Sequence, residues 1–235
     1  MRTAAVVPAA GRGERLGPGA PKALRELAGQ PLLVHAVRAL AEARSVDLVV
    51  VAAPAGEHEA VRLLLGPVVA DTEFSVVPGG ETRQESVALA LRVLPDDVDV
   101  VLVHDAARPL APSELVDAVA NAVRGGADAV VPGVPVTDTI KQVDPAGRVE
   151  LTVDRTVLRA AQTPQGFARL VLEVAHRAAA DEGVIDLTDD AGLVERAGLS
   201  VMVIPGSADA FKVTRPLDLV LAEAVLARRR SAGVH

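Results

Sequence analysis

A glycine-rich segment near the N-terminus carries cationic side chains of the kind that bind phosphate. It spans residues 8–17, contains Arg12 and Arg15, and is followed by Lys22. Glycine-rich turns offer backbone N–H groups to phosphate oxygens. Fixed cations stabilise the negative charge that builds up when a group is transferred from a nucleoside triphosphate. The segment is therefore a candidate triphosphate-binding loop, and its spacing alone leaves an ordinary solvated turn as the alternative.

Other phosphate-binding motifs do not fit this segment. The dinucleotide fingerprint has the pattern G-x-G-x-x-G, but here the third glycine, Gly17, comes one place late. Pro18 and Pro21 exclude the helix that should open at that point. No G-K-[ST] follows, so the segment is not a Walker loop, and the chain has no G-x-S-x-G nucleophile elbow.

A carboxylate follows the valine-rich run at residues 98–103. Asp105 lies in the sequence His-Asp-Ala-Ala-Arg-Pro at residues 104–109. A carboxylate at the carboxyl end of a central strand is well placed to hold a Mg²⁺ ion that bridges phosphates. His104 is more typical of a hydrogen-bonded structural histidine than of a base.

A second glycine turn follows the run at residues 74–77. Gly79 and Gly80 allow a flat base to approach the backbone, and the Ser86 hydroxyl could bond the edge of that base. Thr82 with Glu85 three residues later also predicts a capped helix start. The two interpretations are compatible.

Short valine-rich runs alternate with segments of helical period over the whole chain. We predict strands at residues 3–7, 47–53, 74–77, 98–103, 127–131 and 201–204. We predict helices at residues 32–43, 57–65, 82–94, 113–124, 169–181, 189–197 and 216–229. The runs are almost continuously apolar, as expected of strands covered on both faces. The pattern indicates an α/β fold with a mostly parallel central sheet flanked by helices, and its ligands should lie at the carboxyl ends of the strands.

Residues 138–161 break this alternation. Apolar residues on both sides of a turn at residues 144–147 predict a β-hairpin with no helix to cover it. Such a hairpin is either a sheet edge or an arm that packs on something else. The chain shows no internal repeat or linker, so we predict one domain, residues 1–235, with an arm at about 138–161.

Composition excludes several classes of function. The chain has a net charge of −7 and only three aromatic residues, which argues against binding of single-stranded nucleic acid. The arginines at 228–230 are interpreted as a solvated helix end. The absence of cysteine excludes disulfides and zinc–thiolate sites and suits a cytoplasmic protein. No apolar stretch is long enough to span a membrane, and Pro8 interrupts residues 1–10, so we do not expect a signal peptide or membrane association.

Together these motifs resemble the 2-C-methyl-D-erythritol 4-phosphate cytidylyltransferase family of the methylerythritol phosphate route to isoprenoids. The resemblance covers nearly the whole chain and is carried by an ordered set of short motifs. These are residues 9–22, 78–86, 104–109, 139, 154–155, 163–165 and 212–214. It implies a Rossmann-like nucleotidyltransferase fold and transfer of CMP from CTP to a polyol phosphate, with release of pyrophosphate and no covalent enzyme intermediate.

The resemblance also implies roles for individual residues. The implied catalytic residues are Arg15, Lys22 and Lys212. The implied CTP-binding residues are Ala9, Ala10, Gly11, Gly13, Gly79, Gly80, Glu81, Ser86 and Ala106. The implied substrate-binding residues are Thr139, Arg155, Arg108 and Thr163, and Asp105 is implied to hold Mg²⁺. Thr139 and Arg155 lie on the arm, and in a homodimer with exchanged arms they would serve the partner subunit's site.

The chain departs from the family pattern at two positions. Glu81 stands where the family leads us to expect aspartate, and Ala210 stands where asparagine is frequent. Both bear on fine substrate recognition rather than on the reaction class. The alternatives are a ribitol 5-phosphate cytidylyltransferase and a nucleotide-sensing module without catalysis on the same fold. A nicotinamide dehydrogenase is disfavoured by the glycine spacing.

Overall fold

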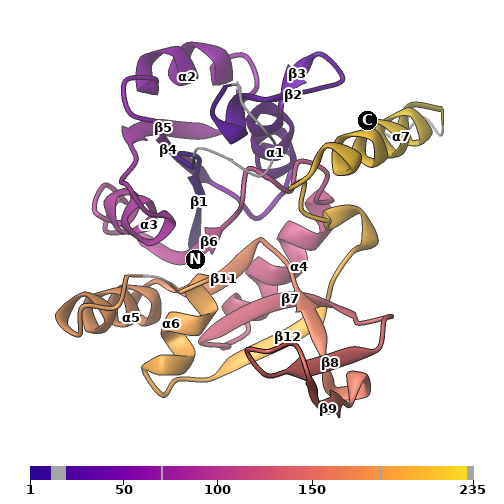
Figure 1. The fold of residues 1–235 in the computed structure, drawn as a ribbon. Helices are drawn as coiled ribbons and strands as arrows, with labels where there is room; N and C mark the ends of the chain where they lie inside the picture. Colours follow the sequence, from indigo (N-terminus) through magenta and orange to yellow (C-terminus); the bar gives the residue numbers. More distant parts are fainter. Residues whose placement is uncertain (12–19, 70, 186, 232–235) are drawn as a thin grey trace.

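A central β-sheet organises the molecule (Figure 1). The computed structural model describes residues 1–11, 20–69, 71–185 and 187–231. The strands of the main sheet are β1 (Arg2–Pro8), β4 (Leu48–Ala53), β5 (Glu73–Pro78), β6 (Val98–Val103), β7 (Ala129–Pro135), β10 (Arg159–Ala161), β11 (Gln165–Ala168) and β12 (Val201–Pro205). Among the described residues they form one sheet in the order β10-β7-β11-β6-β1-β4-β5, with β12 also paired to β7.

Helices cover both faces of this sheet. The helices α1 (Leu32–Ala41), α2 (His58–Leu65) and α4 (Ser113–Arg124) pack on one face, and α3 (Arg83–Leu91), α5 (Arg169–Asp181) and α6 (Asp190–Arg196) pack on the other. Successive strand residues point to opposite faces. In β1, for example, Ala5 and Val7 join the first core and Ala4 and Val6 join the second. This is why the strands read as continuous apolar runs, and the mixed α/β fold predicted from the sequence is confirmed.

The last helix stands partly apart from these layers. Helix α7 (Pro216–Ser231) projects from the body in Figure 1. Its buried residue Ala222 belongs to a small apolar cluster with Leu27, Leu32, Leu110 and Val213. No helix of the described residues combines the length and the apolar character needed to cross a membrane.

All six predicted strands and all seven predicted helices are present, with ends that differ by a few residues. The six predicted strands all run in one direction. β1, β4, β5 and β6 pair in parallel, and β12 pairs in parallel with β7. β7 has the direction of β6 because β11 is antiparallel to both. The strands β10 and β11 were not predicted from the sequence. Both are antiparallel to their neighbours, and they are three and four residues long, too short to give a periodic signal.

The predicted hairpin is present but shorter than expected. It consists of β8 (Ile140–Val143) and β9 (Val149–Val153), and it lies near β7 and β12 in Figure 1. The expectation that the arm extends to residue 161 is wrong, because residues 159–161 form β10 and pair with β7 in the main sheet. Apolar side chains on the hairpin, including Val149 and Leu151, are exposed. Whether the chain forms a single domain stays a prediction.

Several short elements complete the fold. The strands β2 (Glu26–Leu27) and β3 (Gln30–Pro31) pair with each other, and the 3₁₀ helices are η2 (Lys22–Leu24), η3 (Arg155–Val157) and η4 (Ala208–Ala210). η2 places Lys22 beside the carboxyl end of β1, because the Lys22 N–H donates to the carbonyl of Gly11. η4 precedes the loop that carries Lys212. Of the two predicted catalytic lysines, Lys22 therefore lies within a short helical turn and Lys212 follows one.

Candidate functional site

A pocket lies where the carboxyl ends of β1, β5 and β6 meet, which is where ligands bind in parallel α/β sheets. Its volume is about 150 Å³. Its lining residues are Pro8, Ala9, Ala10, Gly11, Lys22, Ala23, Gly80, Glu81, Thr82, Arg83, Ser86, Asp105, Ala106, Ala107 and Lys212. The lining combines small residues, which leave room for a flat ligand, with three cations and two carboxylates.

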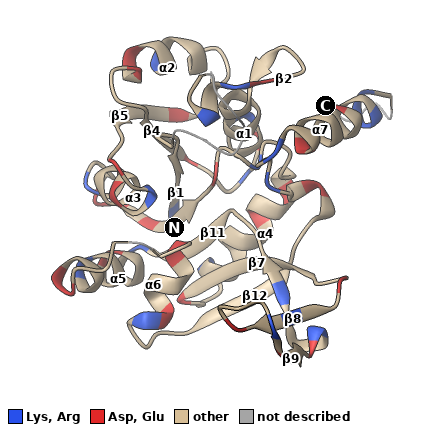
Figure 2. Ribbon diagram, viewed as in Figure 1, with Lys and Arg blue, Asp and Glu red and all other residues tan. Residues whose placement is uncertain are grey.

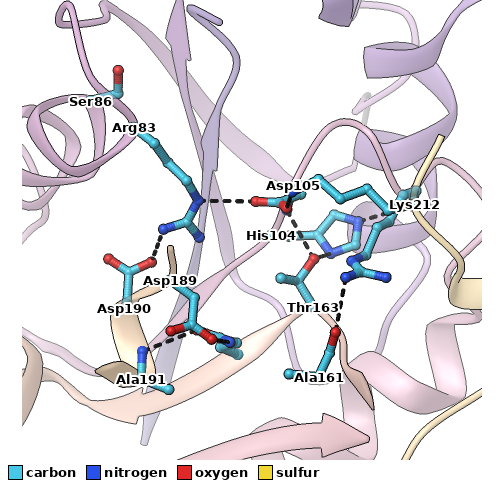
Figure 3. Close-up of polar contacts among 12 residues, drawn as sticks. Arg83, Ser86, His104, Asp105, Ala161, Thr163, Asp189, Asp190, Ala191 and Lys212 are labelled. Carbon is cyan, nitrogen blue, oxygen red and sulfur yellow. Dashed lines mark hydrogen bonds and ion pairs between the residues drawn. The ribbon is translucent and has the colours of Figure 1, made fainter. Parts of the chain in front are cut away.

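The Asp105 carboxylate lies between two cations in this pocket (Figure 3). Arg83 Nε donates to Asp105 Oδ1 over 3.1 Å, and Lys212 Nζ lies 2.7 Å from Oδ2. Burial alone would raise the pKa of Asp105, but the charges of Arg83 and Lys212 outweigh burial and hold that pKa far below its usual range. Asp105 is therefore ionised at neutral pH, and it joins α3 to the loop before α7.

Arg83 is itself held from behind by a second carboxylate. Its Nη1 donates to Asp190 Oδ2 over 2.6 Å, and Asp190 Oδ1 lies 2.9 Å from His176 Nε2. Burial opposes the charge on Arg83, but the Asp190 and Asp105 carboxylates raise its pKa above the ordinary value. Neither Arg83 nor Asp190 was predicted from the sequence to have a role. The sequence feature that could have identified Arg83 is its position in the Gly79–Ser86 motif, three residues before a predicted nucleotide-binding serine.

His104 forms a buried hydrogen-bond chain behind the pocket. The Asp105 N–H donates to Thr163 Oγ1 over 3.0 Å, and Thr163 Oγ1 lies 3.1 Å from His104 Nδ1. His104 Nε2 lies 3.2 Å from the carbonyl of Arg108, so this nitrogen carries the proton and Nδ1 accepts from Thr163. Burial lowers the pKa of His104 to about 4, so the ring is neutral at neutral pH. Both ring nitrogens are occupied, which favours the structural interpretation of this histidine.

The second glycine turn is shaped by Ser86 and the start of α3. The Thr82 side chain accepts from the Glu85 N–H and caps the helix, as predicted. Ser86 Oγ accepts from the Gly80 N–H over 3.1 Å and donates to the Thr82 carbonyl over 2.9 Å. At Gly79, a Cβ atom would approach the Cβ of Ala10 to 2.6 Å, so only glycine lets the turn after β5 lie this close to the segment after β1. The turn is thus fixed as a wall of the pocket.

Arg108 joins the loop after β6 to two distant segments. Its Nη1 donates to the Ala210 carbonyl over 2.7 Å, and its Nη2 donates to the Ala161 carbonyl over 3.0 Å. The Val213 N–H donates to the Ala107 carbonyl over 2.8 Å on the other side of Lys212. These bonds pin the lysine's backbone beside Asp105. Ala210, a departure from the family pattern, takes part through its carbonyl and has no side chain to offer.

Comparison with known proteins identifies the group to which this architecture belongs. The family model described as IspD, 2-C-methyl-D-erythritol 4-phosphate cytidylyltransferase, matches residues 3–228. The chain belongs to this family. A 2-C-methyl-D-erythritol 4-phosphate cytidylyltransferase of Streptomyces coelicolor is 62% identical over an alignment that covers 97% of this chain and 86% of the relative.

Solved structures of the family share the fold. The enzyme of the same name from Thermus thermophilus is 37% identical, with a TM-score of 0.78 and coverage of 97% of this chain and 100% of that chain. The 4-diphosphocytidyl-2C-methyl-D-erythritol synthase of Anaerococcus prevotii is 26% identical, with a TM-score of 0.84 and coverage of 97% and 99%. The chain is therefore an enzyme of the cytidylyltransferase class, as its motifs indicated.

The structure brings most of the predicted nucleotide site of this cytidylyltransferase together. Of the predicted residues, those that line the pocket are Ala9, Ala10, Gly11, Lys22, Gly80, Glu81, Ser86, Asp105, Ala106 and Lys212. Gly79 packs against Ala10 directly behind the wall. Arg15 and Gly13 lie outside the described residues. The contacts of all these residues with CTP stay predictions.

The predicted substrate-binding residues lie elsewhere. Thr139 and Arg155 are exposed at the two ends of the hairpin, and Arg155 Nη1 donates to the carbonyl of Thr137, which precedes the hairpin. Arg108 and Thr163 lie beneath the pocket, with the hydrogen bonds described above. Direct substrate contact by these four residues stays a prediction. The same hydrogen bonds give Arg108 and Thr163 a second role, which is to position Lys212 and Asp105.

The pocket suits a divalent cation that is held mainly by the bound substrate rather than by protein side chains. Among the described residues, no group of three or more His, Asp or Glu side chains could form a site from protein alone. Asp105 is ionised, and each carboxylate oxygen has two lone-pair directions, so its two cation partners leave room for a further one. Mg²⁺ typically binds through one or two carboxylates together with substrate phosphates and water. The donor set therefore fits Mg²⁺ bound with a triphosphate.

The role of Thr163 in the buried hydrogen-bond chain can be tested by substitutions that keep either its volume or its hydroxyl. We expect Thr163→Val to lower the free energy of unfolding by about 1–3 kcal/mol, because His104 Nδ1 and the Asp105 N–H lose their partner. Thr163→Ser keeps the hydroxyl and should cost clearly less. Chemical denaturation of both variants measures the difference. A neutral Thr163→Val variant, or equal losses in the two variants, would contradict the hydrogen-bond chain.

Proposed function

We propose that this chain transfers a cytidylyl group from CTP to 2-C-methyl-D-erythritol 4-phosphate and releases pyrophosphate, giving 4-(cytidine 5'-diphospho)-2-C-methyl-D-erythritol for isoprenoid precursor synthesis. The observation that carries the proposal is the convergence of Lys22, Lys212 and Arg83 on one small-residue pocket at the ends of three parallel strands. A triphosphate is the substrate part that needs such positive charge. The family to which the chain belongs bears the name of this reaction.

In the proposed reaction an anionic oxygen of the acceptor's phosphate attacks the α-phosphorus of CTP. A new P–O bond forms, the bond between the α-phosphorus and the bridging oxygen breaks, and the electron pair leaves with pyrophosphate. The attacking oxygen carries no proton, so no general base is required, which agrees with the neutral and fully engaged His104. Lys22 and Lys212 stabilise the charge that develops on the α-phosphate and on the leaving group.

The base and the phosphates of CTP would occupy different walls of the pocket. The turn at Gly79 and Gly80 provides a flat surface for cytosine, and the loop that begins at Ala9 provides backbone groups for the phosphates. Lys212, fixed by Asp105 and by the bonds around Ala210, faces the same space (Figure 3). Because Lys212 is already held in the free chain, its charge would need little reorganisation when CTP binds.

We expect the purified chain to release pyrophosphate from CTP in the presence of Mg²⁺ and 2-C-methyl-D-erythritol 4-phosphate. Ribitol 5-phosphate should be a poor acceptor. Lys22→Ala is the matched inactive variant, and it should lower kcat by about a hundredfold or more because it removes transition-state charge stabilisation. Preference for ribitol 5-phosphate would establish the alternative enzyme. CTP binding without turnover of either acceptor would establish a sensing module.

Asp105 is proposed as the protein ligand of Mg²⁺, which would supply charge neutralisation for the triphosphate. Asp105→Asn keeps the shape and removes the charge, so the Mg²⁺ concentration for half-maximal rate should rise severalfold. Glu81→Gln changes the other carboxylate that lines the pocket and serves as the matched comparison; it should leave that concentration unchanged. A metal titration of the Asp105→Asn variant that matches wild type would remove Asp105 from the metal's shell.

We further propose a homodimer in which the arm of each chain completes the partner subunit's site. The support is the exposed apolar surface of β8 and β9 together with a cation, Arg155, at the end of the hairpin and away from the chain's own pocket. Guanidinium groups are well suited to bind phosphate. A two-fold axis would create two equivalent sites, each formed by both chains.

The absence of cysteine supports a cytoplasmic location, which fractionation of the native cells would test.

Subunit mixing tests the shared site. Lys22→Ala and Arg155→Ala are each expected to be nearly inactive alone. After exchange, about half of the dimers are mixed, and one site of each mixed dimer is intact if Arg155 acts across the interface, so roughly a quarter of wild-type activity should return.

The matched control mixes Lys22→Ala with Lys212→Ala. Both lysines line the pocket of one chain, so every site keeps a defect and no activity should return. Verified exchange without recovered activity in the first mixture would show that Arg155 does not act across an interface.

A further inference from the structure

The arginines at the end of α7 form the predicted solvated helix end only in part, because Arg228 and Arg230 are exposed whereas Arg229 is half-buried. Figure 2 shows the positive charge gathered at this end of the helix. Arg229 Nη2 donates to the carbonyl of Leu110 over 2.7 Å and to Asp209 Oδ2 over 2.8 Å. The Arg229 side chain is 23% exposed, whereas Arg228, which also reaches Asp209, is 68% exposed. Arg229 is therefore a bridge between two loops rather than a free surface charge.

The two loops that Arg229 joins are those that carry the charged centre of the pocket. Leu110 lies in the loop after β6, five residues beyond Asp105, and its side chain is fully buried. Asp209 lies in η4, three residues before Lys212. Arg108 and Val213 already bind these loops together near the pocket, and Arg229 adds a third connection at their far side. The backbone around Lys212 is thus held both by the contacts near the pocket and by Arg229 at the far side of the two loops.

We propose that Arg229 is a positioning residue for Lys212 in the cytidylyl transfer proposed above. The guanidinium of Arg229 fixes Asp209, and with it η4, against the loop of Asp105, so that Lys212 Nζ stays within reach of both the carboxylate and the reacting phosphates. Arginine is suited to this role because its planar fork donates to two acceptors at once. Arg229 lies outside residues 3–228, to which the family model is matched, so the resemblance to the family does not supply this contact.

The position of Lys212 matters more in the transition state than in binding. A fixed cation is effective because it need not move when charge develops on the phosphates. If the Arg229 bridge is removed, the loop that carries Lys212 becomes more mobile, and Lys212 spends less time in the productive position. The rate of the chemical step should then fall, while the nucleotide contacts at Gly80 and Ser86, on the opposite wall, are unaffected.

The first test compares neighbouring arginines on the same helix. Arg229→Ala should lower kcat about tenfold, which corresponds to about 1.4 kcal/mol, and change the KM for CTP by less than about twofold. Asp209→Asn should reproduce this split, because it removes the charge that Arg229 holds. Arg230→Ala is the matched control. Within the described part of the chain Arg230 makes no hydrogen bond or ion pair, so its kcat should remain that of wild type.

The second test separates positioning from a loss of stability. In a Lys212→Ala background, Arg229→Ala should cause little further loss of kcat, because the residue it positions is gone. Destabilisation alone would lower activity by the same factor in both backgrounds. Circular dichroism melts at the assay concentration verify that each variant is folded, and Asp209→Asn replaces Arg229→Ala if the latter is not.

Two results would overturn the proposal. One is a kcat for Arg229→Ala and Asp209→Asn equal to that of Arg230→Ala, and the other is an equal loss in the wild-type and Lys212→Ala backgrounds. A wild-type chain that fails to release pyrophosphate would instead refute the proposed function. The two failures are therefore distinguishable in one set of assays.

Discussion

The Asp105 carboxylate is buried and remains ionised only because two cations lie against it. Removing a carboxylate from water costs several kcal/mol, and the attraction of close, well-oriented partners must offset that cost. Arg83 and Lys212 provide this attraction from opposite sides. One comes from α3, after the second glycine turn, and the other comes from the loop before α7. The position of one carboxylate thus determines how the two walls of the pocket face each other.

Much of the remaining polar structure supports this arrangement from behind. Asp190 holds Arg83, Thr163 holds the backbone of Asp105, and Arg108 holds the loop of Lys212. The contacts join segments that are far apart in the sequence, namely α6, the connection between β10 and β11, and the loop before α7. Buried networks of this kind are costly when incomplete, because each member that loses a partner remains desolvated. The pocket is consequently rigid where its charges lie.

The sheet could be predicted from the sequence because its parallel strands are covered on both faces. A run such as residues 48–53, buried throughout, reads as an unbroken apolar stretch. The short antiparallel strand β11 could not be found in the same way. It contains Gln165, which is buried only because its amide binds Asp189 and the N–H of Ala191, and Gly166, which admits α4 close to the sheet. Both features depend on contacts with other elements and leave no local pattern.

The candidate site was predictable wherever a local motif carries it. The glycine turns, Asp105 and Lys22 stand out by type and by their place after strands, whereas Lys212 was assigned through the family resemblance. Arg83 and Arg229 do not stand out in the sequence, because their partners Asp190 and Leu110 lie more than a hundred positions away in the chain. An arginine in a motif and an arginine at a helix end look alike in a sequence, and only the fold shows which one has a buried partner.

The interaction between Arg83 and Asp105 is the most direct point at which to test this account. A double-mutant cycle with Arg83→Met and Asp105→Asn, measured as the free energy of unfolding, isolates their coupling. Each single change should cost about 3–5 kcal/mol, because it leaves a buried charge without one of its partners. The double variant should then lose less than the sum of the two by at least about 1 kcal/mol. Losses that add to within about 0.5 kcal/mol would contradict the claim that this ion pair holds the site together.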